Sequence, residues 1–178
     1  MAKKYDHIPV RLEKFIKEQK LFFVATSTAD SKINLSPKGM DSLRVLNNKR
    51  IVWLNLTGSG NETAAHLLEN NRITLMFCAF EGAPLILRVY GKAISYHPRD
   101  IPYQKLIELF PKIAGARQII DIEVEMVQTS CGFAVPYYEF KKERTQLTEW
   151  AEAKNEDDFE RYWHEKNSKS LDDKPTGI

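Results

Sequence analysis

The chain has 178 residues, 43% of them hydrophobic, and its 26 basic and 24 acidic side chains leave a net charge of +2. This composition suffices for a substantial core, which excludes a disordered chain, and the scattered charges give no indication of nucleic-acid binding. The first residues lack the apolar core of a secretion signal, and no run approaches the ~18 apolar residues that cross a bilayer. We therefore expect one domain, residues 1–178, in a soluble cytoplasmic protein without a membrane or nucleic-acid partner.

The cysteine and histidine positions predict neither a disulfide framework nor a metal site. Cys78 and Cys131 lie far apart and form no CxxC pair, so we expect two reduced thiols. His7, His97 and His164 have no companion residues at the spacing that metal ligands require.

The first third of the chain predicts one helix and four strands. Apolar residues recur at helical spacing after Pro9, which favours a short amphipathic helix. The runs that follow are rich in branched and aromatic residues or alternate with polar ones, and short turns separate them. Pro37-Lys38-Gly39 interrupts the second run, as at an edge, a bulge or a close backbone approach. The four predicted strands are 21–28, 32–36, 42–46 and 50–56.

Residues 54–70 form the most distinctive stretch, where an apolar run stops at two glycines and a helical pattern begins. The first N–H groups of a helix have no partner within it, and the helix dipole adds positive charge there, so a phosphate fits such a position. The spacing of Ser59 and Glu62 also suits a capping box, which makes an ordinary capped helix the alternative. Glu62 and His66, four residues apart, are expected to pair on one face of this helix.

The second half of the chain predicts three further strands and several helices. Apolar and acidic residues alternate at 120–126, which predicts a strand with one face in water. Gly91 stands near the middle of a long apolar run, where a barrel strand can bend. A helix over 98–110 must hold Pro102 in its first turn. The other strands are 73–80 and 85–96, a helical extension covers about 140–168, and residues 169–178 are expected to be a tail.

The order of these elements defines the expected fold class. Short strands joined mostly by hairpins, with one helix between strands and others near the ends, are typical of an antiparallel barrel with peripheral helices, a mainly β fold. No repeat, low-complexity segment or linker divides the chain, so we expect a single core.

Four segments in a fixed order also carry a resemblance to a known family. They are Asn34-Leu35-Ser36-Pro37-Lys38-Gly39; Ile51-Val52-Trp53-Leu54-Asn55-Leu56; Gly58-Ser59 with Ala65-His66 and Glu69-Asn70-Asn71-Arg72; and Tyr90-Gly91-Lys92-Ala93. In order and spacing they resemble the FMN-binding split-barrel family typified by pyridoxamine 5'-phosphate oxidase, over about residues 10–130. The segment 130–136 looks like that of uncharacterised flavin-binding relatives rather than that of the oxidase itself.

The resemblance implies an antiparallel split β-barrel that forms a homodimer and holds FMN in a cleft between subunits. Lys38 falls near the oxidase's first phosphate-binding arginine, and Ser59 lies on the loop before the phosphate-binding helix. This chain has Thr63-Ala64 where the oxidase carries an Arg-Lys pair, so two of its phosphate cations are absent. A phosphate still requires a cation. The candidates for that cation are Lys38, Arg44 and Arg88, and the full set of predicted cofactor-binding residues is Lys38, Gly39, Arg44, Ser59, Asn61, Thr63, His66 and Arg88.

The function that the resemblance implies is that of an FMN-dependent oxidoreductase of unknown substrate, in which the flavin transfers electrons and the protein positions it. No catalytic acid or base is predicted. The end of the oxidase that binds pyridoxal phosphate is not recognisable, so we expect no useful oxidation of pyridoxamine phosphate. The alternatives are a non-catalytic flavin- or haem-binding protein and, because cations are absent, a dimeric scaffold with a vacant cleft.

Overall fold

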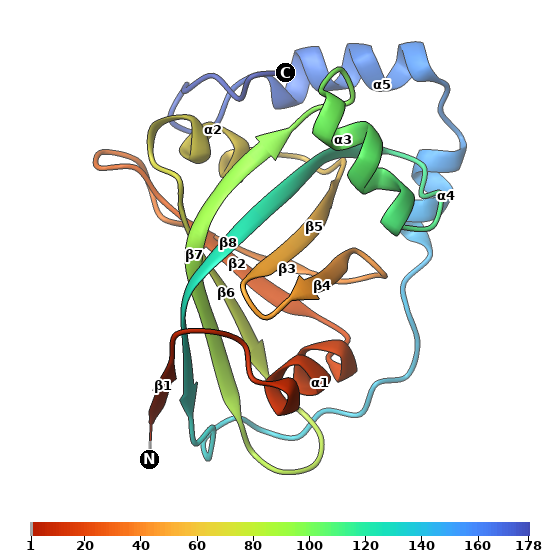
Figure 1. Ribbon diagram of the computed structural model, residues 1–178. Coiled ribbons are helices and arrows are strands. Elements are labelled where there is room, and N and C mark those ends of the chain that lie inside the picture. Colours follow the sequence, from red (N-terminus) through yellow and green to blue (C-terminus); the bar gives the residue numbers. More distant parts are fainter. Residues whose placement is uncertain (1) are drawn as a thin grey trace.

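The computed structural model describes residues 2–178 and contains one antiparallel sheet curled into a split barrel (Figure 1). The strands follow the order β3-β2-β6-β7-β8-β5-β4, with β1 paired to β8. Both β3 and β4 are therefore edges, and the barrel is open between them. The strands are β1 (Lys3–Tyr5), β2 (Phe22–Thr26), β3 (Asn34–Lys38), β4 (Leu43–Asn47), β5 (Arg50–Leu56), β6 (Arg72–Cys78), β7 (Ile86–Tyr96) and β8 (Ala116–Ser130).

Five helices surround the sheet, and the predicted mainly β fold with peripheral helices is confirmed. In Figure 1, α1 lies at the lower end of the barrel and α5 crosses its upper end. The helices are α1 (Val10–Glu18), α2 (Glu62–Glu69), α3 (Ile101–Leu106), α4 (Gln146–Glu152) and α5 (Glu156–Tyr162), with a 3-10 turn at Ile107–Leu109 and a π-helical turn at Trp163–Asn167. None of the helices described within residues 2–178 combines the length and apolar character needed to span a bilayer.

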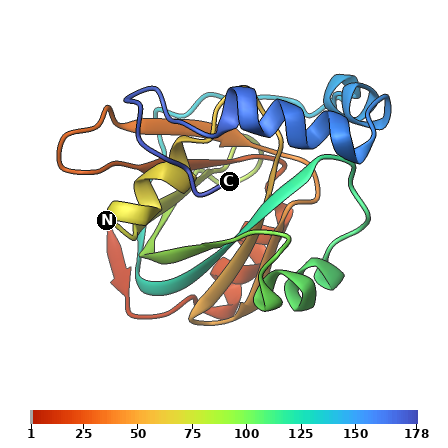
Figure 2. The same cartoon turned by 90° about the horizontal axis from the view of Figure 1, so that it is seen from above.

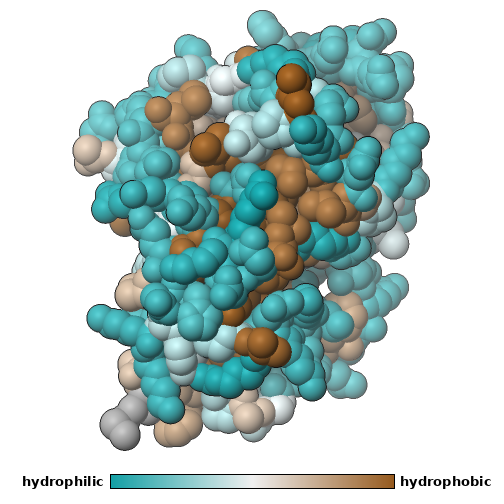
Figure 3. Space-filling model, in the orientation of Figure 1, coloured by the Kyte–Doolittle hydropathy of each residue, from teal (hydrophilic) through white to brown (hydrophobic). Residues whose placement is uncertain are grey.

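Two hydrophobic clusters fill the molecule. The larger one lies inside the barrel, where α1 contributes Leu12 and Ile16, and where the ring of Phe22 packs edge-on against Trp53 and stacked on Phe77. The smaller cluster lies between α3 and the strands β5 and β8. Figure 3 shows apolar side chains reaching the surface near this second cluster, over β5 and beside α3.

The long strand β7 bends at Gly91, as predicted. The pairing of β7 with β8 shifts register between Tyr90 and Gly91, and a Cβ atom at Gly91 would overlap the carbonyl oxygen of Glu123 on β8. Only glycine allows the two backbones to approach this closely. The bend lets one strand serve both ends of the barrel.

The alternating stretch on β8 behaves as predicted up to Glu125, but Met126 is only half-buried, because the register shift opposite Gly91 moves the buried face to Val127. Ile120, Ile122 and Val124 are buried, whereas Glu123 and Glu125 are exposed. Of the three positions expected for Pro37, the structure has the edge, but the strand does not end at Ser36: β3 continues to Lys38, and Pro37 pairs with Phe23. A proline fits there because β3 is an edge strand, with one side free of ladder hydrogen bonds.

Residues 169–178 do not form the expected tail. Thr176 is only 1% exposed, and the Lys174 ammonium pairs with Glu69 on α2 and with Asp30, both at 2.9 Å. The Leu171 N–H donates to the carboxylate of Glu62, at the start of α2. Figures 1 and 2 both place this segment alongside α2. Polar contacts hold residues 169–178 in place. Their lack of apolar side chains therefore led to the wrong prediction of a tail.

Candidate functional site

A cavity of about 490 Å³ lies in the opening of the barrel, between the end of β3 and β5. Its volume is within the range of cavities that hold cofactor-sized ligands. The Trp53 ring forms an apolar wall, and the segment after β8 covers the outer side with Phe140 and Leu147. The polar or glycine residues that line it include Lys20, Lys38, Gly39, Ser42, Asn55, Thr57, Gly58, Lys142, Glu143 and Arg144.

Lys38 brings a positive charge into this cavity. Along β3 the side chains at even positions are partly buried, and those of Leu35 and Pro37 point to solvent. The Lys38 ammonium lies 5.0 Å from the centre of the Trp53 ring, and within residues 2–178 it has neither a hydrogen-bond acceptor nor a carboxylate partner. Burial, and secondarily repulsion from Arg117, lowers the pKa of Lys38 to about 8.

Arg117 is a second cation near this cavity, more deeply buried than Lys38, and the sequence analysis did not identify it. Asn55 pairs with Gln118 and Leu56 with Ala116, so Arg117 is the extra residue of a β-bulge, a feature that redirects side chains near active sites. Only 2% of Arg117 is exposed, and burial lowers its pKa to about 10.

The hydrogen bonds of Arg117 leave its charge uncompensated. One guanidinium nitrogen, Nη1, donates to Asn167 Oδ1 at 2.6 Å and to the Gly60 carbonyl at 3.2 Å, while the buried Nε has no acceptor. No carboxylate in the described part of the chain pairs with this arginine. A buried guanidinium without a counter-charge is costly, and together with Lys38 it makes this region attractive to an anion.

The loop between β5 and α2, residues 57–61, packs against Arg117. Thr57 Oγ1 donates to the Gly115 carbonyl at 2.7 Å and accepts from the Trp163 indole at 2.8 Å. Ser59 is exposed, and the buried Asn61 has an Oδ1 without a donor. The helix begins at Glu62 with Asn61 as its N-cap, so the Ser59–Glu62 capping box is wrong. The carboxylate of Glu62 instead accepts from the backbone N–H of Leu171, in the C-terminal segment.

Thr63 and His66 fasten α2 to the sheet. Thr63 Oγ1 accepts from Asn34 Nδ2 at 3.2 Å, and the fully buried His66 places Nδ1 3.0 Å from Thr26 Oγ1. The predicted pairing of His66 with Glu62 is wrong, because His66 faces β2 whereas Glu62 faces the C-terminal segment. The other ring nitrogen of His66, Nε2, is buried without a partner.

The other two candidate cations lie elsewhere. Arg44 makes a two-point contact with the Asp41 carboxylate, with one N–O distance of 2.8 Å, and stacks over the Phe110 ring, so its charge is already compensated. Arg88 is on β7, separated from β3 by β2 and β6, and donates to Ser130 Oγ at 3.3 Å. Neither Arg44 nor Arg88 lines the cavity that holds Lys38.

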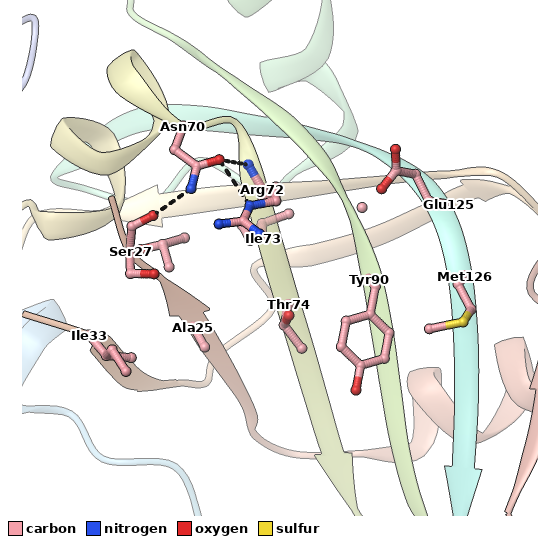
Figure 4. Close-up of a pocket in the computed structure, with 12 residues that line it drawn as sticks. Ala25, Ser27, Ile33, Asn70, Arg72, Ile73, Thr74, Tyr90, Glu125 and Met126 are labelled. Atoms are coloured by element: carbon pink, nitrogen blue, oxygen red, sulfur yellow. Dashed lines mark hydrogen bonds between the residues drawn. The ribbon is translucent and has the colours of Figure 1, made fainter. Parts of the chain in front are cut away.

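A second hollow, of about 430 Å³, crosses the outer face of β2, β6, β7 and β8 (Figure 4). Asn70 ties its upper edge together: Nδ2 donates to the Ser27 carbonyl at 2.9 Å, and Oδ1 accepts from Arg72 Nε at 3.2 Å. Arg72 is exposed, and Glu125 pairs with Lys92 at 3.1 Å. This hollow therefore lacks the buried, uncompensated charge of the cavity beside β3.

Similarity to known proteins agrees with this architecture. A curated relative, the pyridoxamine 5'-phosphate oxidase family protein ustO of Aspergillus flavus, is 34% identical over 190 residues, which span 96% of this chain and 76% of that protein. The crystal structure of a variant of HupZ from group A Streptococcus is similar over 69% of this chain and 99% of its own, with 23% identity and a TM-score of 0.56. The structure of the FAD binding protein from Mycobacterium smegmatis is similar over 70% of this chain and 96% of its own, with 13% identity and a TM-score of 0.51.

The family follows from the sequence match together with this fold. Residues 8–131, more than half of the chain, match the sequence profile described as pyridoxamine 5'-phosphate oxidase. The match spans β2 to β8 and includes Lys38, the loop before α2 and Arg117. The chain belongs to the pyridoxamine 5'-phosphate oxidase family.

Proposed function

We propose that this protein binds FMN in the cavity beside β3, with the phosphate group between Lys38 and Arg117. The observation that carries the proposal is a partly buried Lys38 and a fully buried Arg117, neither of which has a carboxylate partner in residues 2–178. Each cation loses hydration on folding, and a dianionic phosphate restores favourable interactions to both. The family contains flavin-binding members, and a similar structure is an FAD binding protein.

Polar groups around the two cations suit the rest of the phosphate and the sugar-like chain of FMN. Ser59 and Thr63 supply hydroxyls at the start of α2, where free backbone N–H groups and the helix dipole favour an anion. Asn61, at the start of α2, has a buried Oδ1 that accepts no hydrogen bond within residues 2–178. Gly39 and Trp53 line the adjoining space, where the apolar wall fits an aromatic ring system.

An FMN-dependent oxidoreductase is the activity we propose for this site. When bound, a flavin supplies hydride or one-electron transfer, and the chain's own residues bind, orient and shield it. His66 is too deeply buried to reach a substrate, and its role is to hold α2 against β2. A substrate would approach from the outer side of the cavity, past the covering segment that carries Phe140 and Arg144.

A homodimer is part of the proposal. The β3 edge presents Ile33 and Leu35 with 79% and 62% of their surfaces exposed, and a second apolar area lies over β5 (Figure 3). Exposed apolar areas of this kind are typical of association surfaces. Sedimentation equilibrium is expected to give twice the chain mass of 20.6 kDa. A monomer with full FMN affinity would contradict a cofactor cleft between subunits.

Absorption spectroscopy of the purified protein tests the proposed cofactor. We expect a yellow protein whose flavin bands bleach under dithionite and whose released flavin is FMN. A Soret band would indicate haem instead, and a colourless protein that takes up neither cofactor would support a scaffold. Turnover of pyridoxamine phosphate by the FMN-loaded protein would overturn the expectation that it is not the substrate.

The affinity for FMN is expected to fall as the pH rises above about 8. Lys38 has a pKa of about 8 without a ligand, and a bound phosphate raises that pKa toward or above the ordinary 10.5, so binding takes up a proton in this window. The phosphate itself stays dianionic there, because its second pKa is about 6. Fluorescence titrations between about pH 7 and 9.5 should show up to a tenfold loss per pH unit above pH 8. A flat profile would remove Lys38 from the site.

A further inference from the structure

The C-terminal extension supplies the main hydrogen-bond partner of Arg117. Asn167 is fully buried, and its Oδ1 accepts from Arg117 Nη1 at 2.6 Å. Its Nδ2 donates to the Gly58 carbonyl at 3.0 Å. One side-chain amide thus connects the cation on β8 to the loop that precedes α2.

The backbone of Asn167 is fixed from both sides. Its carbonyl accepts from Thr176 Oγ1 at 2.6 Å and from Asn61 Nδ2 at 3.4 Å. Beyond it, Glu62 and Glu69 on α2 hold the residues up to Lys174. Both views of the ribbon show this segment passing beside α2 (Figures 1 and 2). Asn167 therefore has little freedom to rotate away from Arg117.

The chemistry of the partner matters as much as its position. A buried arginine usually faces a carboxylate, which satisfies its N–H groups and cancels its charge. An amide oxygen satisfies an N–H and leaves the charge in place. We propose that Asn167 is a positioning residue that orients Arg117 and the loop 57–61 for a phosphate group while keeping the positive charge available, an inference that rests on the proposed function.

Asn167→Asp tests both parts of this role, because it has nearly the same shape, compensates Arg117 internally and cannot donate to the Gly58 carbonyl. We expect the affinities for FMN and for inorganic phosphate to fall at least tenfold, and the affinity for riboflavin, which lacks the phosphate, to change little. A merely structural role would weaken FMN and riboflavin together. Asn48→Asp, in an exposed turn, adds the same charge far from the cavity and should bind FMN like the wild type.

The outcomes separate the inference from the proposed function. Wild-type affinity of Asn167→Asp for FMN and phosphate would overturn the role of Asn167. A wild-type protein that binds inorganic phosphate but not FMN, with phosphate binding lost in Asn167→Asp, would support the inference and contradict the cofactor. Binding of neither ligand by the wild type would overturn both. If Asn167→Asp lacks the near-ultraviolet circular dichroism of the folded protein, Asn167→Ala is tested in its place. An affinity of Asn167→Ala for FMN equal to that of the wild type would then reject the inference.

Discussion

Replacing Lys38 by methionine is expected to weaken FMN binding by roughly 10- to 100-fold, the equivalent of one charge-assisted hydrogen bond of about 1.5–3 kcal/mol. The same change should raise the free energy of unfolding of the cofactor-free protein at neutral pH. Apart from the Trp53 ring, the Lys38 ammonium has no hydrogen-bond acceptor or carboxylate to lose within residues 2–178, and burial, which lowers its pKa to about 8, makes its charged form unfavourable in the folded state. Isothermal titration with FMN and chemical denaturation measure the two effects.

The pH dependence and two controls make this prediction specific. The stabilising effect of Lys38→Met should be complete below about pH 8, decrease between pH 8 and 10.5, and vanish above 10.5, where the lysine is neutral in both the folded and the unfolded state. Riboflavin affinity should change little. Lys105→Met removes an exposed lysine of α3 and should leave FMN binding unchanged. Equal FMN affinity in Lys38→Met and wild type would show that the phosphate lies elsewhere.

Gly91→Ala is expected to lower the free energy of unfolding by roughly 3 kcal/mol, at the upper end for inserting a methyl group into a packed region. The new Cβ would overlap the backbone carbonyl of Glu123, which belongs to the longest strand and has no freedom to rotate away. For a domain of this size the loss corresponds to roughly 6–12 °C in Tm. Thermal and urea denaturation of the cofactor-free protein measure it.

Gly58→Ala is the matched control for stability. An added Cβ at Gly58 meets no atom within 4 Å, and its backbone is not left-handed, so the unfolding free energy should change by no more than about 0.5 kcal/mol. If Gly91→Ala unfolded at the same temperature as Gly58→Ala, the close contact of β7 with β8 would be contradicted.

Much of the barrel was predictable because its strands obey local rules. The alternation on β8 and the glycine in β7 are short-range signals whose meaning does not depend on distant contacts. Pro37 was informative only in part: an edge was one of the three positions that it allowed, and the strand order that decides among them is not a local property.

The candidate site was only partly predictable. Lys38 stands in a segment with a family resemblance, but Arg117 is aimed inward by a bulge, a change of register that depends on the pairing of β5 with β8. Asn167 lies in a polar stretch more than 100 residues after the loop that it contacts. Hydrophobic patterning has no signal for contacts of this kind, since they depend on hydrogen bonds to one buried cation.

The position of Asn167 in the chain also sets the order in which the molecule is completed during synthesis. The sheet has all of its strands once Ser130 has emerged from the ribosome, and Asn167 follows roughly 2–7 s later at the ~5–20 residues per second of translation. Until then, Asn167 cannot form its hydrogen bonds with Arg117 and the loop 57–61. On the proposed function, the nascent barrel is therefore expected to form before it can bind flavin, and the flavin content would report whether residues 167–178 have docked.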